Sequence, residues 1–147
     1  ISTGGSSMLM KSPLGNFTES KPVLDYIRLE NKFGPQGGGT VSQKVRFSAS
    51  LDASKKVMWI ALSLRLDVES CEVPHSPMLL GEIRTHVGFS FEKEQDPSVI
   101  DNDEILEMFT EPLYQRTAEM LAVNLNLMGF SINLPLVRPA ESVKPIQ

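Results

Sequence analysis

The sequence contains a single cysteine, Cys71, and only two histidines, His75 and His86, among 147 residues. One cysteine cannot form a disulfide within the chain, so we expect a reducing compartment and a cytoplasmic protein. So few nitrogen and sulfur ligands, without a paired motif, predict no metal site. Cys71 and His75 could in principle form a nucleophile and its base. No pattern places them together, however, so we expect no catalytic residue and no cofactor.

Basic residues and long apolar runs are also scarce. The 14 Lys and Arg residues are outnumbered by 18 Asp and Glu, which gives a net charge of −4. Such a balance disfavours non-specific binding to nucleic acid. No apolar run approaches the roughly 20 residues that a membrane-spanning helix needs. The N-terminal residues show no basic stretch followed by an apolar block, so we predict neither a secretion signal nor a membrane span.

Two stretches that might be taken for ligand-binding loops lack the residues such loops need. The acids between residues 92 and 104 do not show the alternating oxygen ligands and central glycine of a calcium loop. The three glycines at residues 37–39 are not followed by the Lys-Ser/Thr pair of a phosphate loop. We interpret both stretches as solvated loops.

Two long runs of alternating side chains dominate residues 56–92, on either side of a proline-containing break at residues 71–77. Side chains alternate between the faces of a strand, so each run predicts a strand with one apolar face, whereas a helix would scatter the same residues around its circumference. The apolar faces comprise Met58, Ile60, Leu62, Leu64, Leu66 and Val68 in the first run, and Leu79, Gly81, Ile83, Thr85, Val87, Phe89 and Phe91 in the second.

Two more strands are expected before this pair. Residues 21–33 alternate moderately, and Pro22 suits the start of a strand or an edge. Residues 41–51 alternate cleanly, and the short polar segment 52–55 predicts a hairpin into the next strand. Because the connections are too short for crossover helices, the sequence predicts a four-stranded antiparallel meander.

The C-terminal part predicts helices that cover this sheet. Residues 100–109 fit a short helix, and Thr110-Glu111-Pro112 fits the start of a second one that reaches about Met128. An apolar stripe marks the second helix, comprising Tyr114, Ala118, Leu121, Leu125 and Met128. The predicted fold class is therefore α+β, an antiparallel sheet covered on one face by C-terminal helices.

The expected domain organisation is simple. Residues 1–20 are predicted to be flexible, with residues 1–7 a linker or an expression remnant. A single α+β domain is expected over residues 21–137, followed by a loose tail at residues 138–147.

One apolar group lies on the otherwise polar face of the predicted sheet. Val57, Trp59 and Ala61 share the parity opposite to the main apolar row, and Trp59 is the only tryptophan. The group indicates a second buried surface, either a contact with a partner or a binding groove. The alternative is that the C-terminal helix and tail cover it.

The order of the elements resembles the SecB family of export chaperones over roughly residues 21–137. Four strands are followed by a helix and an extended segment rich in proline and asparagine. The local similarities are Leu80-Gly81-Glu82-Ile83 with Gly88-Phe89-Ser90-Phe91, Leu113-Tyr114 with Glu119, and Gly129-Phe130 with Ile132-Asn133-Leu134-Pro135.

The resemblance implies a chaperone or holdase that binds unfolded or extended polypeptide in apolar grooves without ATP, and that assembles as a dimer or tetramer. The residues it suggests for polypeptide contact are Val57, Trp59, Ala61, Phe130, Leu134 and Leu136. The positions similar to the acids that meet a translocation ATPase in the family are Asp25, Glu30 and Glu82. The competing hypotheses are a structural or adaptor subunit that assembles with itself or with one fixed protein partner, such as an antitoxin, and, less favoured, a small enzyme around Cys71 and His75.

Overall fold

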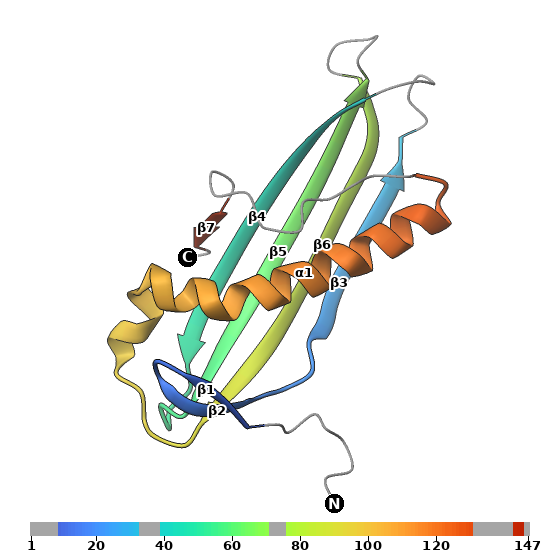
Figure 1. The fold of residues 1–147 in the computed structure, drawn as a ribbon. Coiled ribbons are helices and arrows are strands. Elements are labelled where there is room, and N and C mark those ends of the chain that lie inside the picture. The colour runs from blue at the N-terminus through green and yellow to red at the C-terminus, as the bar shows by residue number, and fades with distance from the viewer. Residues whose placement is uncertain (1–8, 33–38, 71–75, 131–142, 146–147) are drawn as a thin grey trace, which may run out of the picture.

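The computed structural model describes residues 9–32, 39–70 and 76–130, and the backbone of residues 143–145. It shows a seven-stranded sheet crossed on one face by a long helix (Figure 1). The strands are β1 (Leu9–Ser12), β2 (Gly15–Glu19), β3 (Val23–Asn31), β4 (Gly39–Leu51), β5 (Val57–Ser70), β6 (Pro77–Phe91) and β7 (Val143–Pro145). A 3-10 helix, η1 (Pro97–Asp101), precedes the α-helix α1 (Asp103–Leu127).

The three long strands β4, β5 and β6 form the antiparallel meander that the alternation predicts. Leu51 pairs with Met58 at the β4–β5 hairpin, and the register continues without interruption to Gly39 and Ser70. In the hairpin turn, the Asp52 carboxylate accepts hydrogen bonds from the Ser54 hydroxyl and the Val57 backbone N–H. These bonds stabilise the charged form and lower the pKa of Asp52.

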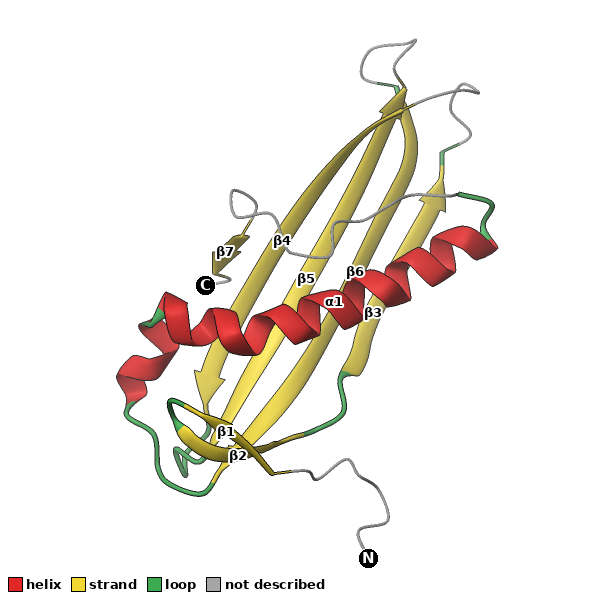
Figure 2. Cartoon of the chain, viewed as in Figure 1, coloured by secondary structure: helices red, strands yellow, loops and turns green. Residues whose placement is uncertain are grey.

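The predicted place of the first strand is wrong, because β3 does not extend the meander beside β4. It pairs antiparallel with β6 instead, so the sheet order places β6 between β3 and β5 (Figure 2). This position lets the apolar side of β3 join the core under α1, where Leu29 and Leu121 both approach Gly81. The sheet also has more than the four strands predicted, and β7 adds a short parallel pairing to β4 within the predicted loose tail.

The segment predicted to be flexible contains a hairpin over residues 9–19, formed by β1 and β2. Strand β2 pairs with the end of β6, and its Phe17 side chain is buried. The Phe17 ring lies 5.7 Å from Phe89, 5.7 Å from Phe91 and 5.2 Å from Phe109, measured between ring centroids. One aromatic anchor in a polar segment thus attaches the hairpin to the core, which the low hydrophobicity around it concealed.

The C-terminal region forms one continuous helix rather than the two predicted. Asn102 is the N-cap of α1, with its side chain accepting the Ile105 N–H, and Pro112 lies inside the helix. An interior proline removes one backbone hydrogen bond. The helix continues past Pro112 because buried apolar residues on both sides of the proline pack against the sheet. Leu106 and Phe109 before the proline and Leu113 and Tyr114 after it pack on the same sheet.

Polar side chains between α1 and the sheet are paired. The Thr85 hydroxyl of β6 meets the Thr117 hydroxyl of α1 at 2.7 Å, and Thr117 also donates to the Leu113 carbonyl. The Gln43 amide of β4 donates to the Tyr114 hydroxyl at 2.8 Å. Burial raises the pKa of Tyr114, so the phenol stays neutral. These contacts fix α1 across the strands, on one face of the sheet.

Candidate functional site

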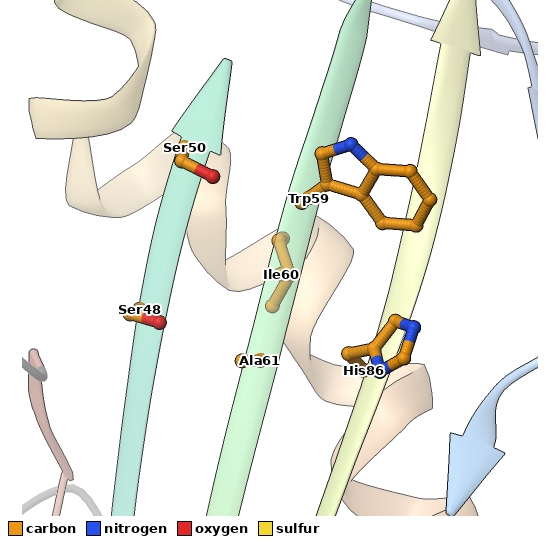
Figure 3. A pocket seen from close by; sticks show the side chains of 6 residues that line it. All are labelled: Ser48, Ser50, Trp59, Ile60, Ala61 and His86. Atoms are coloured by element: carbon orange, nitrogen blue, oxygen red, sulfur yellow. The ribbon is translucent and has the colours of Figure 1, made fainter. Parts of the chain in front are cut away.

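The face of the sheet opposite α1, here called the open face, carries the predicted Trp59 group. Figure 3 views this face, with α1 behind the strands. The Trp59 side chain is 43% exposed although it is large and apolar. It borders a hollow of about 310 Å³, here called the Trp59 hollow, which is lined by Ser48, Ser50, Trp59, Ile60, Ala61 and His86. A mostly apolar, open hollow on a sheet face that α1 does not cover is a candidate contact surface for another polypeptide.

The orientation of the Trp59 ring depends on a glycine in the neighbouring strand. Trp59 of β5 pairs directly with Gly88 of β6, and the indole lies across the β6 backbone at this point (Figure 3). A Cβ atom at position 88 would lie 2.7 Å from Trp59 Cζ3, closer than real contacts allow. The absence of a side chain at Gly88 therefore lets the ring lie against the sheet and leaves its outer surface exposed.

We predict that Gly88→Ala displaces the Trp59 ring without breaking the sheet, because an added methyl group and the indole cannot occupy the same space. The fluorescence of the only tryptophan should shift to longer wavelength, and the variant should lose about 1 kcal/mol of unfolding free energy. Ser90→Ala, an exposed change on the same strand, is the control. An unchanged emission spectrum in Gly88→Ala would contradict the packing described.

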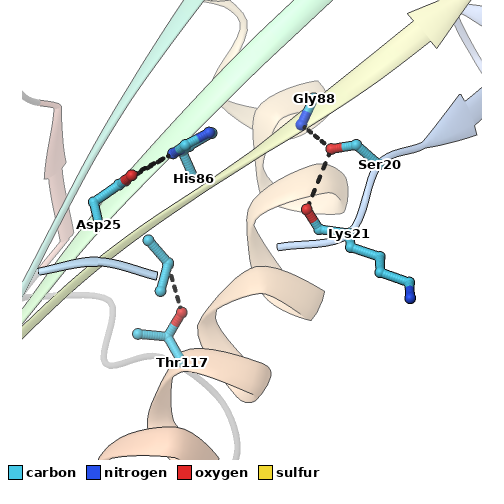
Figure 4. A network of polar contacts seen from close by, with 7 residues as sticks. Ser20, Lys21, Asp25, His86, Gly88 and Thr117 are labelled. Carbon is cyan, nitrogen blue, oxygen red and sulfur yellow. Dashed lines mark hydrogen bonds and ion pairs between the residues drawn. The ribbon is translucent and has the colours of Figure 1, made fainter. Parts of the chain in front are cut away.

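The side of the hollow is held by a His–Asp pair. His86 Nδ1 lies 2.7 Å from Asp25 Oδ2 and 2.8 Å from Oδ1 (Figure 4). Asp25 falls in an irregularity of the β3–β6 register, between Leu24 and Tyr26, and such a bulge can turn a side chain toward a neighbouring strand. The His86 ring also meets the edge of the Trp59 ring, with 5.8 Å between centroids.

A backbone connection joins Ser20 to Gly88 where the neighbour of β6 changes from β2 to β3. The Ser20 N–H donates to the Gly88 carbonyl at 2.8 Å. The Gly88 N–H donates to the Ser20 hydroxyl, also at 2.8 Å (Figure 4). Ser20 thus pairs both backbone groups of Gly88 in the gap between the two strands. The position opposite Trp59 is therefore held firmly by its backbone although it has no side chain.

The structure brings together three of the six residues predicted to contact polypeptide. Val57, Trp59 and Ala61 lie in line on β5 on the open face. Phe130 does not join them, since it follows α1 on the other face, packs partly buried against the core and donates its N–H to the Leu125 carbonyl. The remaining two residues, Leu134 and Leu136, lie outside the described residues, as do Cys71 and His75.

Each of the three acids predicted to meet a translocation ATPase lies beside a basic side chain of its own chain. Asp25 contacts His86, Glu30 contacts Arg28 and Lys32, and Glu82 lies 3.5 Å from Arg84. Hydrogen bonds from Lys32 and then from Arg28 lower the pKa of Glu30. The role of the three acids in binding a partner stays a prediction.

Sequence reasoning did not select Ser48, Ser50 or His86 for the hollow. Strand register brings them there: Ser50 pairs with Trp59, and Ala61 lies between Ser48 and His86. The sequence indicates only that these side chains lie on the outward face of their strands. Many other surface residues share this property, so it does not single them out. Within the described part of the chain, no group of three or more His, Cys, Asp or Glu side chains could hold a metal ion, and no helix is long and apolar enough to cross a membrane.

Comparisons with known proteins show which solved structures have a similar fold. No protein-family model and no curated protein sequence matches this chain. Among solved structures, a SecB-like chaperone of Mycobacterium tuberculosis, in complex with a peptide from the HigA1 antitoxin, matches with a TM-score of 0.60 and 13% identity. The match covers 84% of this chain and 92% of that one. A protein of unknown function from Streptococcus agalactiae matches with a TM-score of 0.48 and 11% identity, covering 81% and 96% of the two chains.

At such low identity the similarity concerns the fold alone. The predicted resemblance to SecB-like proteins is thereby confirmed at that level, and the expected α+β architecture with it. The chain has the fold of a SecB-like chaperone.

Proposed function

We propose that this protein binds unfolded or extended segments of other proteins, as a holdase that does not use ATP. The observation that carries the proposal is the Trp59 hollow on a sheet face that α1 does not cover. The SecB-like fold supports it, since the mycobacterial neighbour is a chaperone in complex with a peptide. An enzymatic role has no comparable support among the described residues.

The size of the hollow suits weak, reversible binding. Covering the exposed part of one aromatic side chain contributes on the order of 2 kcal/mol. The serines at its border can hydrogen-bond to a peptide backbone, which is the same in every client. A surface that combines one apolar contact with sequence-independent polar contacts binds many extended chains with modest affinity.

Aggregation of a chemically denatured client, followed by light scattering, tests the proposal. We expect the full chain in molar excess to delay aggregation without added nucleotide. Calorimetry should detect binding to a permanently unfolded, reduced protein, and the emission of Trp59 should shift on binding because this residue is the only tryptophan. If the chain neither delays aggregation nor binds the unfolded protein, the holdase proposal fails.

The alternative is a protein with one fixed polypeptide partner. The observation in its favour is that the mycobacterial neighbour was solved with a peptide from one antitoxin. A set of unrelated unfolded clients separates the two functions. A general holdase binds most of them with similar affinity, whereas a dedicated protein binds none of them and still captures its own partner.

Self-assembly into a dimer or tetramer belongs to the same proposal. It is supported by β3, which pairs with β6 along one edge and, within the described residues, with no strand along the other. Unpaired strand edges favour pairing with another chain. Solution mass by light scattering gives the number of copies, and a strict monomer would contradict this part of the proposal.

A further inference from the structure

Basic side chains gather on the open face although the whole chain is acidic. Strand register aligns Lys44, Arg65, Glu82 and Arg28 in one row across four strands, and Arg46, Ser63, Arg84 and Tyr26 in the next row. These two rows contain five cations and one acid, in a protein with a net charge of −4. We call the five cations the basic band: Arg28, Lys44, Arg46, Arg65 and Arg84.

The basic band lies between two different surfaces. The row beyond Arg65 carries Asp67 and, on β3, Glu30. On the other side, the row of Ala61 and His86 leads to the Trp59 hollow. Ser63, in the nearer row of the band, lies four positions along β5 from Trp59, about 13 Å at the rise of a strand. Apolar, basic and acidic surfaces therefore follow one another along the open face.

The cations of the band are available to an external anion. The side chains of Arg28, Arg65 and Arg84 are 51%, 49% and 56% exposed. Each makes a surface ion pair with the acid two residues away on its own strand. Such exposed pairs contribute little to stability, so exchanging one for a partner's carboxylate costs little.

Two cations of the band are not paired in this way. Within the part of the chain that the structure describes, no carboxylate lies within ion-pair distance of Lys44 or Arg46. Glu82 lies inside the band at 3.5 Å from Arg84, and its charge also acts on Arg65. Glu82 thus serves the band as an internal counter-ion.

We propose that the basic band and the Trp59 hollow together bind an acidic segment of an extended polypeptide. An apolar side chain enters the hollow, and carboxylates about four residues away meet the band. This inference rests on the proposed function and specifies the chemical class of client that this face prefers. A nucleic acid strand fits less well, because its continuous phosphate chain would also meet the acids at Asp67 and Glu30.

Three synthetic peptides test the preference with the full chain. Each has one central phenylalanine and no tryptophan, and differs only in flanking residues: glutamate, glutamine or lysine. Binding is read from Trp59 fluorescence and calorimetry at low and high salt. We expect the glutamate peptide to bind about tenfold more tightly than the glutamine peptide at low salt, and this advantage to shrink as salt screens the charges.

The double variant Lys44→Gln/Arg46→Gln tests whether the preference for the glutamate peptide depends on the basic band. Since these cations have no described carboxylate partner, their removal leaves no acid unpaired. We expect affinity for the glutamate peptide to fall about fivefold, with affinity for the glutamine peptide unchanged. Lys11→Gln/Lys93→Gln, with the same change in charge at exposed positions outside the band, is the control and should leave both affinities unchanged.

The outcomes separate the two proposals. If the glutamine peptide binds and the glutamate peptide binds no more tightly, or the lysine peptide binds best, the acidic preference is wrong while the holdase stands. If none of the peptides binds, the proposed function and this inference fail together. Tighter binding of a 12-nucleotide oligothymidine than of the glutamate peptide would overturn the polypeptide assignment in favour of single-stranded nucleic acid.

Discussion

Replacing Trp59 by serine is expected to reduce affinity for an unfolded client at least tenfold and to remove most of the delay in aggregation. The exposed indole supplies the largest apolar contact in the hollow, on the order of 2 kcal/mol when covered. Trp59 is 43% exposed and the rest of its surface packs against the sheet, so its removal should also cost about 2 kcal/mol of unfolding free energy. Calorimetry against a permanently unfolded protein measures the loss, and the urea midpoint checks that the variant folds.

A matched variant on the other side of the molecule controls for the loss of an exposed apolar side chain. Val123 of α1 is 59% exposed and lies outside the open face. Val123→Ser should bind clients as the parent protein does. If Trp59→Ser binds with undiminished affinity, the hollow is not the contact surface. If both variants bind equally weakly, the contact is not specific to the open face.

Phe17→Ala should cost about 3–5 kcal/mol of unfolding free energy, a large share of the stability of an ordinary domain. The ring is buried among Phe89, Phe91 and Phe109. Its removal leaves a cavity where the β1–β2 hairpin joins the end of β6 and the N-terminal part of α1. Urea unfolding followed by circular dichroism measures the change, and the hairpin amides should lose protection from hydrogen exchange.

Thr18→Ala is the control for that prediction. Thr18 neighbours Phe17 in β2 and pairs with Ser90, but it is only partly buried. Its substitution should cost less than about 1 kcal/mol. A similarly small cost for Phe17→Ala would show that the hairpin does not contribute to the core, in agreement with the flexible segment that the sequence predicted.

The sequence predicted the parts of the fold that repeat locally. Alternation over residues 41–51 and 56–92 identified β4, β5 and β6, because a half-buried strand alternates apolar and polar residues along the sequence. The stripe from Tyr114 to Leu125 identified the second half of α1 in the same way. The parity of Trp59 correctly placed it on the face opposite to the apolar row.

Errors arose where distant contacts override local signals. Thr110-Glu111-Pro112 has the composition of a helix start, yet packing on both sides of Pro112 keeps α1 continuous. Phe17 is one aromatic residue in a polar segment, and only its distant aromatic neighbours make it an anchor. The resemblance grouped Phe130 with Trp59 for polypeptide contact, although in the structure Phe130 follows α1 and packs against the core on the opposite face.

The sequence itself determined the existence of the strands β3 to β6, the apolar face of each long strand and the side to which Trp59 points, since alternation needs no knowledge of neighbours. Only the tertiary structure decided where the strands outside the β4–β5–β6 meander lie. It placed β3 against β6, which brings Asp25 to His86, and it aligned five cations from four strands into one band. The physical reason is that strand order and register depend on contacts between residues far apart in the chain, and no local pattern records them.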